Sequence, residues 1–454
     1  MSDDETFRRV LALLQRYGRE ATSFQILEPG LKFWFAGDAV VGYGDLEDAW
    51  VSAGEPVCDE ARLGEVARGF IEAAGHEGKR ARFFHVSEGF AQRAGLRATH
   101  VGELPVWDPS DWDATVKATR SLREQIKRPR PKGVTARLID PLEMGQQESA
   151  VRRQCDAVIR SWLHDRGMSE LKFMVRLHPY GFPEERRYVV AEQAGRVIGF
   201  AVAIPVYGRQ GWFIEDLVRE PTTPNGTVEL LIDTLMRAFA AEGSHYATLG
   251  LAPLAGKVRP ILAFTRNYTT RLYNFPGVRS FKEKLKPKRW EPVYLAYPRR
   301  ELGVLAMRDV LAAFASGGLV RFGLQTLVHQ RTLATFLLGL FLVPWTIALA
   351  FLDTATWFPS ARIQYAWVGL DVLLISVMGA LVLRWRARLA TVAVLLTTLD
   401  AVLTSIQFLL WNVWTTRTLL AWALVTVGWA GPALAATFFW NTRLVAMQSR
   451  RLRV

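Results

Sequence analysis

The chain has 454 residues, half of them hydrophobic, and its 56 Lys and Arg against 43 Asp and Glu give a net charge of +13. This length predicts two or three domains, and the hydrophobic content excludes a mainly disordered chain. The two cysteines, Cys58 and Cys155, exclude a disulfide scaffold and a four-cysteine zinc site, while the positive charge favours an anionic partner, either nucleic acid or anionic lipid.

The first hundred residues predict a unit of mixed helices and strands. Apolar residues recur with helical spacing from Phe7 to Tyr17, and Gly18 can end that helix. Three elements follow in order: a β-hairpin at 31–43 around Gly37-Asp38, a helix capped by Asp59 that runs to about Ala74, and a strand at 81–87. One α/β unit is therefore complete by about residue 108.

Two strongly basic stretches flank the next part of the chain. Residues 116–137 carry a net charge of +7, and Arg120, Arg123 and Lys127 share one face of a predicted helix that ends before Pro129. Residues 257–300 carry a net charge of +10. Such runs are often only solvated faces, but because two of them surround one unit, a surface that binds RNA or phospholipid is an equally good interpretation.

A second α/β unit lies between these basic stretches. Its predicted elements are a β-hairpin at 186–208 around Ala194-Gly195, a strand at 211–218, an amphipathic helix at Thr227–Glu242 and a strand at 246–254. This order resembles the core of the GNAT acetyltransferase fold. The first unit has a similar, weaker order, so the sequence predicts a tandem pair of GNAT-like units.

The densest group of unusual polar residues is the segment IEDLVREPTTPNG, from Ile214 to Gly226. Asp216 and Arg219 lie at the end of the predicted strand, and Asn225-Gly226 opens the amphipathic helix. A loop that leads into a helix N-terminus can bind phosphate or a developing oxyanion. A structural Asp–Arg pair followed by a turn is the equally weighted alternative.

Other catalytic patterns carry less weight. The sequence contains no HExxH, GxSxG, Walker A or GxGxxG motif, so the corresponding protease, hydrolase and nucleotide-binding classes lack support. His85, in an apolar strand, is interpreted as a core residue, and His178 and His245 are weak general-base candidates.

The last third of the chain has a different composition. Residues 321–454 contain 11 Arg, 3 Asp and neither Lys nor Glu, and they hold nine of the 16 Trp residues. Four apolar runs, 333–352, 365–383, 389–414 and 418–442, are each long enough to cross the hydrocarbon core as a helix. We therefore predict four transmembrane helices.

The loops between these runs predict their orientation. Arginines are abundant before the first run, between the second and third, and after the fourth, and sparse in the other two loops. We expect both termini and the α/β part on the cytoplasmic side of a bacterial-type inner membrane, and no signal peptide in MSDDETFRR. Asp371 and Asp400 lie inside spans, which suggests a function; the alternative is that they lie near span ends, or are protonated and satisfied by Ser376, Thr397 or Gln407.

Two longer stretches carry a family resemblance. Residues 212–256, WFIEDLVREPTTPNG and onward, and residues 273–298, YNFPGVRSFKEKLKPKRWEPVYLAYP, resemble the signature stretches of the aminoacyl-phosphatidylglycerol synthase family, which includes phosphatidylglycerol lysyltransferases. The first half of the chain is similar more loosely, so the resemblance covers roughly residues 20–300. Members of this family have two GNAT-like units separated by a basic helix, and they move an amino acid from aminoacyl-tRNA onto a hydroxyl of a membrane lipid.

The resemblance implies roles for individual residues. Asp216 and Arg219 match the active-site pair, with Asp216 handling a proton or binding an ammonium group and Arg219 orienting it or holding phosphate. Substrate-binding positions and the tRNA-binding face are implied as well: Asn225, Gly226, Tyr273, Lys282 and Lys284 for the former, Arg120, Arg123 and Lys127 for the latter. Because an aminoacyl ester is already activated, no metal or other cofactor is expected.

The sequence also departs from the family. Val218 replaces the usual Met, Pro129 and Pro131 interrupt the basic helix, and the membrane helices follow the synthase part, where well-known members place a flippase domain before it. We therefore expect these helices to anchor the protein or to present lipid. The amino acid, the lipid acceptor and the oligomeric state stay open.

The predicted organisation has five segments. They are a first GNAT-like unit at 1–112, a basic helix and linker at 113–137, a second, catalytic GNAT-like unit at 138–300, a connector at 301–331 and a four-helix transmembrane domain at 332–454. The partners expected are aminoacyl-tRNA and an anionic phospholipid. Two alternatives remain: a GNAT-like acyltransferase that uses acyl-CoA or acyl carrier protein, although the RxxGxG/A loop of such enzymes is missing after Arg219, and a non-catalytic membrane protein that binds lipid or RNA.

Overall fold

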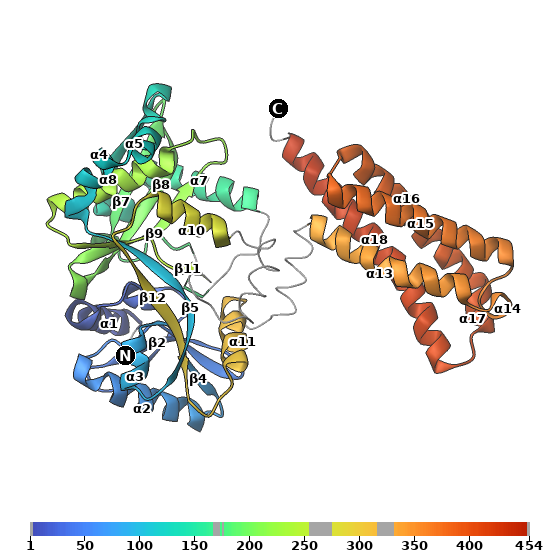
Figure 1. Cartoon of the computed structure of the whole chain (residues 1–454), viewed down its shortest axis with the longest axis horizontal. Coiled ribbons are helices and arrows are strands. Elements are labelled where there is room, and N and C mark those ends of the chain that lie inside the picture. The colour runs from blue at the N-terminus through green and yellow to red at the C-terminus, as the bar shows by residue number, and fades with distance from the viewer. Residues whose placement is uncertain (1–2, 167–172, 175–176, 254–274, 316–330, 452–454) are drawn as a thin grey trace. The chain divides into compact units, whose positions relative to one another are not determined.

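The structure, a computed structural model, describes residues 3–166, 173–174, 177–253, 275–315 and 331–451. It consists of two compact units, an α/β unit at Met1–Val320 and a helical unit at Arg321–Val454 (Figure 1).

The first half of the α/β unit contains the predicted elements. The hairpin consists of β1 and β2, Asp59 caps a 3₁₀ turn that leads into α2 by accepting from the backbone N–H of Ala61, and the strand at 81–87 is β4. The bounds in order are α1 Asp3–Tyr17, β1 Lys32–Phe35, β2 Val40–Asp45, β3 Ala49–Ala53, α2 Leu63–His76, β4 Arg80–Val86, α3 Glu88–Arg93 and β5 Arg97–Trp107.

The basic segment folds into two short helices. They are α4 Trp112–Ala118 and α5 Arg120–Lys127, and α5 ends just before Pro129, as predicted. Leu122 and Ile126 point inward from α5 into the core of the second half. Because α5 packs against α8, the basic helix is part of the fold and not a free linker.

The second half repeats the same types of element. Its bounds are β6 Val134–Ile139, α6 Pro141–Gly145, α7 Ala150–Arg166, β7 Arg187–Gln193, β8 Arg196–Val206, β9 Gly211–Arg219, α8 Thr227–Ala241, β10 Tyr246–Thr248, β11 Ala252–Pro253, α10 Phe275–Lys284, β12 Arg289–Tyr297 and α11 Gly303–Phe314. The single strand predicted at 246–254 is wrong in one respect: it is broken between β10 and β11, where Gly250 has a φ of +72° that other residues rarely adopt.

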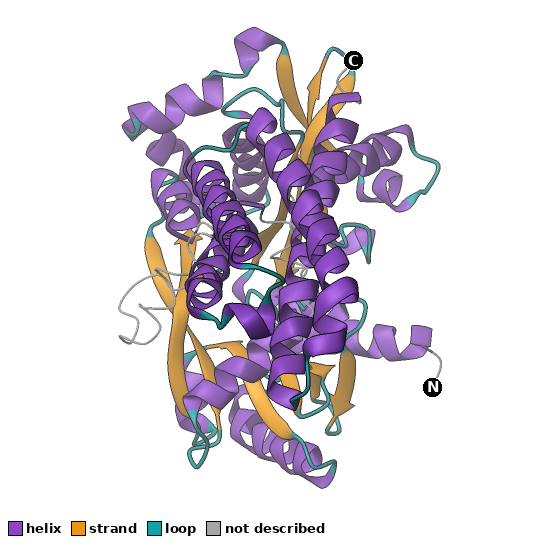
Figure 2. Ribbon diagram, turned by 90° about the vertical axis from the view of Figure 1, so that its right-hand side faces the viewer, coloured by secondary structure: helices purple, strands orange, loops and turns teal. Residues whose placement is uncertain are grey.

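All strands of the described chain belong to one twisted sheet (Figure 2). Their order is β1-β2-β3-β4-β12-β5-β10-β9-β8-β7-β6, with β11 paired to β5. The last strands of the two halves are exchanged: β5 pairs with β10 of the second half, and β12 pairs with β4 of the first. The long antiparallel pair β5–β12 therefore joins the halves, which is visible in Figure 1 where the two strands cross.

Helices cover both faces of this sheet. In the second half α8 packs on one face, where Leu231, Leu235 and Phe239 are fully buried as predicted, and α7 packs on the other. One hydrophobic cluster contains residues of both halves, from Val10 and Phe24 to Ile204 and Leu295. The tandem GNAT-like α/β fold is confirmed, and its two halves share a core.

Helix α11 of the α/β unit is held in place by buried charged groups. Asp309 on α11 accepts from Arg80 Nη2 at 2.9 Å and from Arg82 Nε at 3.0 Å, and the side chain of Arg82 is fully buried. Arg82 also pairs with Glu301. This helix lies inside the predicted connector at 301–331, and it packs on β3, β4 and β12.

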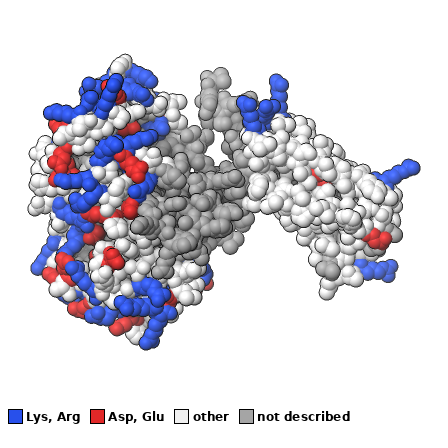
Figure 3. Space-filling model, in the orientation of Figure 1, with Lys and Arg blue, Asp and Glu red and all other residues white. Residues whose placement is uncertain are grey.

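The helical unit contains four helices long and apolar enough to cross a membrane, as predicted. The candidate spans are Ala334–Phe351, Ala361–Leu383, Ala387–Thr415 and Ala421–Asn441, and the side of the unit visible in Figure 3 carries charge almost only at its ends. The helices are α13 Arg331–Phe351, α14 Thr354–Trp357, α15 Ala361–Leu383, α16 Ala387–Gln407, a π-helical turn at Phe408–Asn412, α17 Val413–Thr415 and α18 Leu419–Arg451.

Candidate functional site

Strand β9 carries the central acidic residues of the site. Its pairing with β8 is regular except for a bulge, where Asp216 lies opposite Val202 but Ile214 lies opposite Ala203, so that Glu215 is the extra residue. Asp216 is 9% exposed, and its Oδ2 is buried without a hydrogen-bond partner in the part of the chain that the structure describes. Burial and the neighbouring Glu215 raise the pKa of Asp216 well above its usual value.

A second carboxylate reaches this strand from the first half. Glu28 follows the 3₁₀ turn Ser23–Leu27 and is 6% exposed. Burial and the charges of Glu215 and Asp216 raise its pKa well above the usual value for a glutamate. The sequence interval between Glu28 and Asp216 is long, and only the packing of the two halves brings these groups together.

Arg186 supplies the positive charge of this acidic cluster, which we define as Glu28, Glu215, Asp216 and Arg186. Its Nη1 lies 2.8 Å from Glu215 Oε2, and its Nε donates to the carbonyl of Gly181 at 2.6 Å. Gln25 Nε2 donates to the other Glu215 oxygen at 2.8 Å. Three buried carboxyl groups thus face one guanidinium, so that the cluster can accept a further cation or hold a proton.

Arg219 is separated from Asp216 by the geometry of the strand. The two residues are three positions apart on a regular stretch of β9, so their side chains point to opposite faces of the sheet. Arg219 Nη1 donates to the carbonyl of Glu220 at 3.2 Å, and within the described residues it forms no pair with Asp216. The structural Asp–Arg pair considered above is therefore absent from the described contacts.

The Asn225-Gly226 turn packs against the basic helix. Gly226 has a φ of +95°, and a Cβ at this position would lie 2.2 Å from the carbonyl oxygen of Gln125 on α5. Asn225 is exposed. The start of α8 is thus covered by α5.

We expect Gly226→Ala to destabilise the α/β unit by roughly 2 kcal/mol, because the substitution combines a left-handed backbone with a contact to an immobile carbonyl. Gly75→Ala is the control, since Gly75 lies near the end of α2 with a negative φ and open space around its Cα. That variant should be neutral or slightly stabilising. Thermal unfolding of both chains measures the difference, and equal melting temperatures would contradict the packing described here.

The predicted lysines have different environments. Lys282 on α10 is 7% exposed and donates from Nζ to the carbonyls of Gly250 and Leu251 at 2.8 and 2.9 Å, where β10 and β11 separate. Burial lowers the pKa of Lys282 to about 7. Lys284 is exposed. Tyr273 lies outside the described residues.

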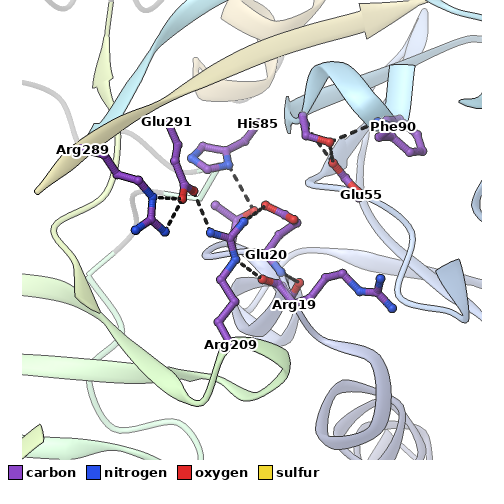
Figure 4. Close-up of polar contacts among 11 residues, drawn as sticks. Arg19, Glu20, Glu55, His85, Phe90, Arg209, Arg289 and Glu291 are labelled. Atoms are coloured by element: carbon purple, nitrogen blue, oxygen red, sulfur yellow. Dashed lines mark hydrogen bonds and ion pairs between the residues drawn. The ribbon is translucent and has the colours of Figure 1, made fainter. Parts of the chain in front are cut away.

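A polar network joins the two halves of the α/β unit (Figure 4). Arg209 of the second half lies 2.7 Å from Glu291 on β12 and 3.5 Å from Glu20 of the first half, and its Nε donates to the carbonyl of Arg19 at 3.0 Å. His85 contributes its Nδ1, 3.5 Å from the Thr22 hydroxyl. His85 is buried as predicted, with a φ of +65°, and burial lowers its pKa to about 4, so it is neutral.

Glu55 lies at the edge of this network. Its Oε1 accepts from the backbone N–H and the hydroxyl of Ser87 at 2.8 and 2.7 Å. Burial, with a contribution from the charge of Glu20, raises the pKa of Glu55 to about 7. The native chain therefore holds a proton here that the unfolded chain releases near pH 4.5.

This raised pKa predicts a pH-dependent loss of stability. Between about pH 4.5 and 7 the folded state binds more protons than the unfolded state, so the free energy of unfolding falls as the pH rises. Glu55→Gln keeps an acceptor for Ser87 but removes the titratable carboxyl group. It should therefore reduce the fall in the free energy of unfolding over this pH range by on the order of 2 kcal/mol. Melting temperatures of both chains from pH 5 to 8 measure this, and parallel curves would show that Glu55 does not titrate in this range.

The basic helix α5 presents only part of its predicted face to solvent. Arg120 and Lys127 are exposed, whereas Arg123 donates to the carbonyls of Lys117 and Val116 at the end of α4. In the described part of the second basic stretch, Arg279, Lys288 and Arg289 are paired with acidic side chains. The free positive charge around α5 continues into Arg128, Arg130 and Lys132, which are exposed.

Several of these residues escaped sequence-based prediction. Glu28, Arg186 and Arg209 lie in unremarkable segments, and their roles depend on contacts between the halves. Two signals were available: Glu215 directly precedes Asp216 inside an apolar strand, and period-two alternation separates Asp216 from Arg219. Of the histidines considered as general bases, His245 has a mostly exposed side chain that lies 3.8 Å from Asp108, so it is not part of a buried site.

The chain thus combines a tandem GNAT-like α/β fold, which contains a buried acidic cluster, with a unit of four candidate membrane helices. A family model described as "Phosphatidylglycerol lysyltransferase, C-terminal" matches residues 11–297, and the chain belongs to this family. The family resemblance noted in the sequence is thereby confirmed.

Curated relatives agree with this assignment. The phosphatidylglycerol lysyltransferase of Bacillus subtilis is 24% identical over 312 residues, which cover 65% of this chain and 36% of that protein. The lysylphosphatidylglycerol biosynthesis bifunctional protein LysX of Mycobacterium tuberculosis is 24% identical over 367 residues, covering 74% of this chain and 30% of that protein. The chain thus spans about a third of the length of these relatives.

Solved structures show the same fold. The C-terminal domain of a putative lysylphosphatidylglycerol synthetase from Agrobacterium fabrum superposes with a TM-score of 0.61 at 24% identity, covering 70% of this chain and 99% of that structure. L-PGS from Bacillus licheniformis gives a TM-score of 0.58 at 23% identity, with 67% of this chain and 95% of that structure covered.

Proposed function

We propose that this protein transfers an aminoacyl group from aminoacyl-tRNA to a hydroxyl of a membrane lipid such as phosphatidylglycerol, at the cytoplasmic face of the membrane. The observation that carries this proposal is the buried carboxyl of Asp216, one oxygen of which has no hydrogen-bond partner among the described residues, inside a cluster of three carboxyl groups and one arginine. The names of the curated relatives support the substrate class.

The charge of the acidic cluster suits an aminoacyl substrate. Every aminoacyl ester carries an α-ammonium group, and a cation placed beside Glu28, Glu215 and Asp216 would stabilise the ionised forms of these carboxyl groups. An adjacent ammonium also lowers the pKa of a carboxyl group, so substrate binding would convert Asp216 to its basic, ionised form. Binding and activation of the base are then the same event.

The reaction requires one bond to form and one to break. The lipid hydroxyl oxygen attacks the ester carbonyl, the bond from that carbonyl to the ribose oxygen of tRNA breaks, and the hydroxyl proton passes to the released ribose oxygen. Asp216 is the group we assign to that proton transfer. Lys282, whose pKa of about 7 leaves it near half-protonated at neutral pH, is our candidate for stabilising charge on the carbonyl oxygen.

An acyl-CoA-dependent reaction is the second candidate, and the start of α8 argues against it. A pyrophosphate bound at a helix N-terminus needs open backbone N–H groups and room for phosphate. Here the Gln125 carbonyl occupies the position next to Gly226, and α5 covers the turn. We keep Arg219, which points to the opposite face of the sheet from Asp216, and the exposed Asn225 as candidate phosphate contacts outside the acidic cluster.

We assign tRNA binding to the surface of α5. Arg120→Ala combined with Lys127→Ala should weaken tRNA binding and reduce the slope of log affinity against log salt by roughly one to two, because each lost phosphate contact removes about one released counterion. Arg8→Ala with Arg16→Ala on the exposed face of α1 is the control of equal charge change. Electrophoretic binding assays at several salt concentrations test this; a slope unchanged in the α5 variant removes this helix from the model.

The orientation of the helical unit is part of the proposal. Arginines are concentrated between the second and third spans, at Arg384, Arg386 and Arg388, and after the fourth span. This distribution favours a cytoplasmic location for both the N-terminal and the C-terminal end of the helical unit's chain. That orientation would place the α/β unit on the side where aminoacyl-tRNA is made. A reporter fused after Val454 should then report the cytoplasm.

A reconstituted assay tests the function directly. Full-length protein in vesicles that contain phosphatidylglycerol receives tRNA charged with a labelled amino acid, with and without prior RNase treatment. We expect label in the lipid fraction only when the tRNA is intact. Transfer that survives RNase and depends on added acyl-CoA would establish the second candidate instead.

A further inference from the structure

The helical unit contains a cavity that the synthase chemistry does not use. Its volume is about 200 Å³, and side chains of α13, α15, α16 and α18 line it. Two of these are aspartates in the middle of their spans: Asp371 of Ala361–Leu383 and Asp400 of Ala387–Thr415. A cavity of this size accommodates a small organic group and not merely one water molecule.

Both aspartates are almost completely buried, at 3% and 6% exposure. Asp371 Oδ2 accepts from the hydroxyl of Thr346 at 3.2 Å, and Asp400 Oδ1 accepts from the hydroxyl of Thr404 at 3.1 Å. Ser376, Thr397 and Gln407, considered above as their partners, instead bond to backbone carbonyls or to Trp367. The alternative that the aspartates lie near span ends is therefore wrong, and so are the partners it named.

No positive charge balances this pair within the described residues. The arginines of the helical unit whose side chains the structure describes lie near helix ends or in loops, and none of them is paired with either aspartate; they are Arg362, Arg384, Arg386, Arg388 and Arg417. A carboxyl group at this depth is costly unless a cation or a proton accompanies it. A ligand that brings its own positive charge would remove that cost.

The rest of the lining suits an ammonium group. Indole and phenyl rings surround the carboxyl groups, including Trp345, Trp367, Trp429 and Phe408, the last two stacked with ring centres 5.3 Å apart. Aromatic faces attract alkylammonium ions, and a carboxylate beside them completes the usual recognition of such cations. Within the residues described, no set of three metal-ligating side chains gathers in the chain.

The cavity reaches the side of the bundle between α13 and α18. These two helices pack on α15 and α16 respectively, and at one point the Trp345 ring of α13 reaches α18, where a Cβ at Gly428 would meet it at 2.8 Å. Phe341 and Leu424 line the cavity and are also exposed on the outside of the bundle. Acyl chains can therefore remain outside, along this apolar seam, while a headgroup enters.

We propose that this cavity binds the ammonium headgroup of an aminoacylated membrane lipid, with Asp371 and Asp400 as its anionic partners and the indole rings as its walls. The identity of the lipid rests on the proposed function, since an aminoacyl ester on a lipid hydroxyl is the product of that reaction. The recognition itself requires only a primary ammonium on a lipid. The helical unit thus has a binding role in addition to anchoring the synthase.

Binding of defined lipids to the full-length protein tests this proposal without any transfer reaction. The probes are dioctanoyl lysyl-phosphatidylglycerol, the same lipid acetylated on both lysyl amino groups and, as a water-soluble amine, lysine methyl ester. Bound ligand is counted by native mass spectrometry across a titration in detergent. The wild-type chain should bind the free-amine lipid at least roughly tenfold more tightly than the acetylated lipid. Lysine methyl ester should bind far more weakly than the free-amine lipid.

Variants locate the site, because the synthase cluster could also bind an ammonium group. In an Asp216→Asn background, the chain should still prefer the free-amine lipid over the acetylated lipid. Adding both Asp371→Asn and Asp400→Asn should abolish this preference, and adding either one alone should reduce it. Asp353→Asn, which removes an exposed carboxyl group just after α13, is the matched control and should keep the preference. Gel-filtration profiles show which variants fold, and the single variants serve if the double variant does not.

Three outcomes would overturn the proposal. They are equal binding of the free and acetylated lipids in the Asp216→Asn background, an undiminished preference in the folded Asp371 and Asp400 variants, and binding of lysine methyl ester as tight as that of the lipid. Because none of these measurements uses tRNA, a failed transferase assay leaves them unaffected. Conversely, active transfer without lipid discrimination would refute only the membrane site.

Discussion

Asp216→Asn is expected to reduce aminoacyl transfer by roughly 10²- to 10⁴-fold, the range in which a positioned acid or base contributes to catalysis. Asparagine fills nearly the same space on β9 but cannot exchange a proton or balance an ammonium group. The transfer assay with intact charged tRNA measures the loss. A variant that retains wild-type turnover would show that proton transfer occurs elsewhere.

The same substitution should leave the fold intact. Asp216 is buried with a raised pKa, so above the usual pKa of an aspartate the folded state binds a proton that the unfolded state has released. This difference destabilises the wild-type chain as the pH rises, and the amide removes it. The melting temperature of Asp216→Asn should therefore equal or exceed that of the wild type at pH 8. A fall in melting temperature would point to a structural role.

A carboxyl group on β7, two strands away from β9 in the same sheet, provides the matched control. Glu192 on β7 pairs with Arg137 at 2.9 Å near the surface and lies outside the acidic cluster. Glu192→Gln removes one negative charge from the same sheet, and exposed ion pairs of this kind contribute about 1 kcal/mol or less. Transfer should be unchanged in this variant, so that a loss confined to Asp216→Asn reports on the cluster and not on net charge.

Asp309→Ala is expected to destabilise the α/β unit by about 3 kcal/mol, because it leaves the fully buried guanidinium of Arg82 with one carboxyl partner fewer. In a unit of this size such a loss lowers the melting temperature by roughly 5 °C or more. Thermal unfolding of the full chain in detergent measures it. The effect should extend over the whole unit, since β4, which carries Arg80 and Arg82, is an interior strand that pairs with β12.

Arg308→Ala on the same helix is the control for this prediction. Arg308 directly precedes Asp309, but its side chain is more than half exposed and its only described pair, with Asp48, spans 3.6 Å. Its removal should change stability by less than about 0.5 kcal/mol. If both substitutions had the same small effect, the buried pairs would not be what holds α11 in place.

Elements with a strong local signal could be predicted from the sequence. The hairpin turn at Ala194-Gly195 has positive φ at both residues, and the helix after Gly226 has a clear apolar face that ends at Gly243. The four membrane spans follow from length and hydrophobicity alone. In each case the residues that determine the structure are neighbours in sequence, so the periodicity of a short window is sufficient.

What could not be predicted depends on contacts between distant segments. Nothing near Glu28 indicates that it will lie beside Asp216, and nothing in the FKEK run indicates that Lys282 turns inward to two carbonyls while Lys284 faces solvent. The pairing of β4 with β12 has no local signal either, because strand patterns specify a face but not a partner. The acidic cluster arises from this long-range packing.

The exchanged strands also determine the order in which the chain can fold during synthesis. The first half cannot complete its sheet when it leaves the ribosome, because β4 pairs with β12, and β12 is synthesised only later and ends at Tyr297. The first candidate span begins soon afterwards, at Ala334. Contacts so distant in sequence form slowly and leave unpaired strand edges exposed meanwhile. The nascent α/β unit must therefore complete its sheet at about the time when the following helix enters the bilayer. Folding of the α/β unit and membrane insertion of the helical unit are thus coupled in time.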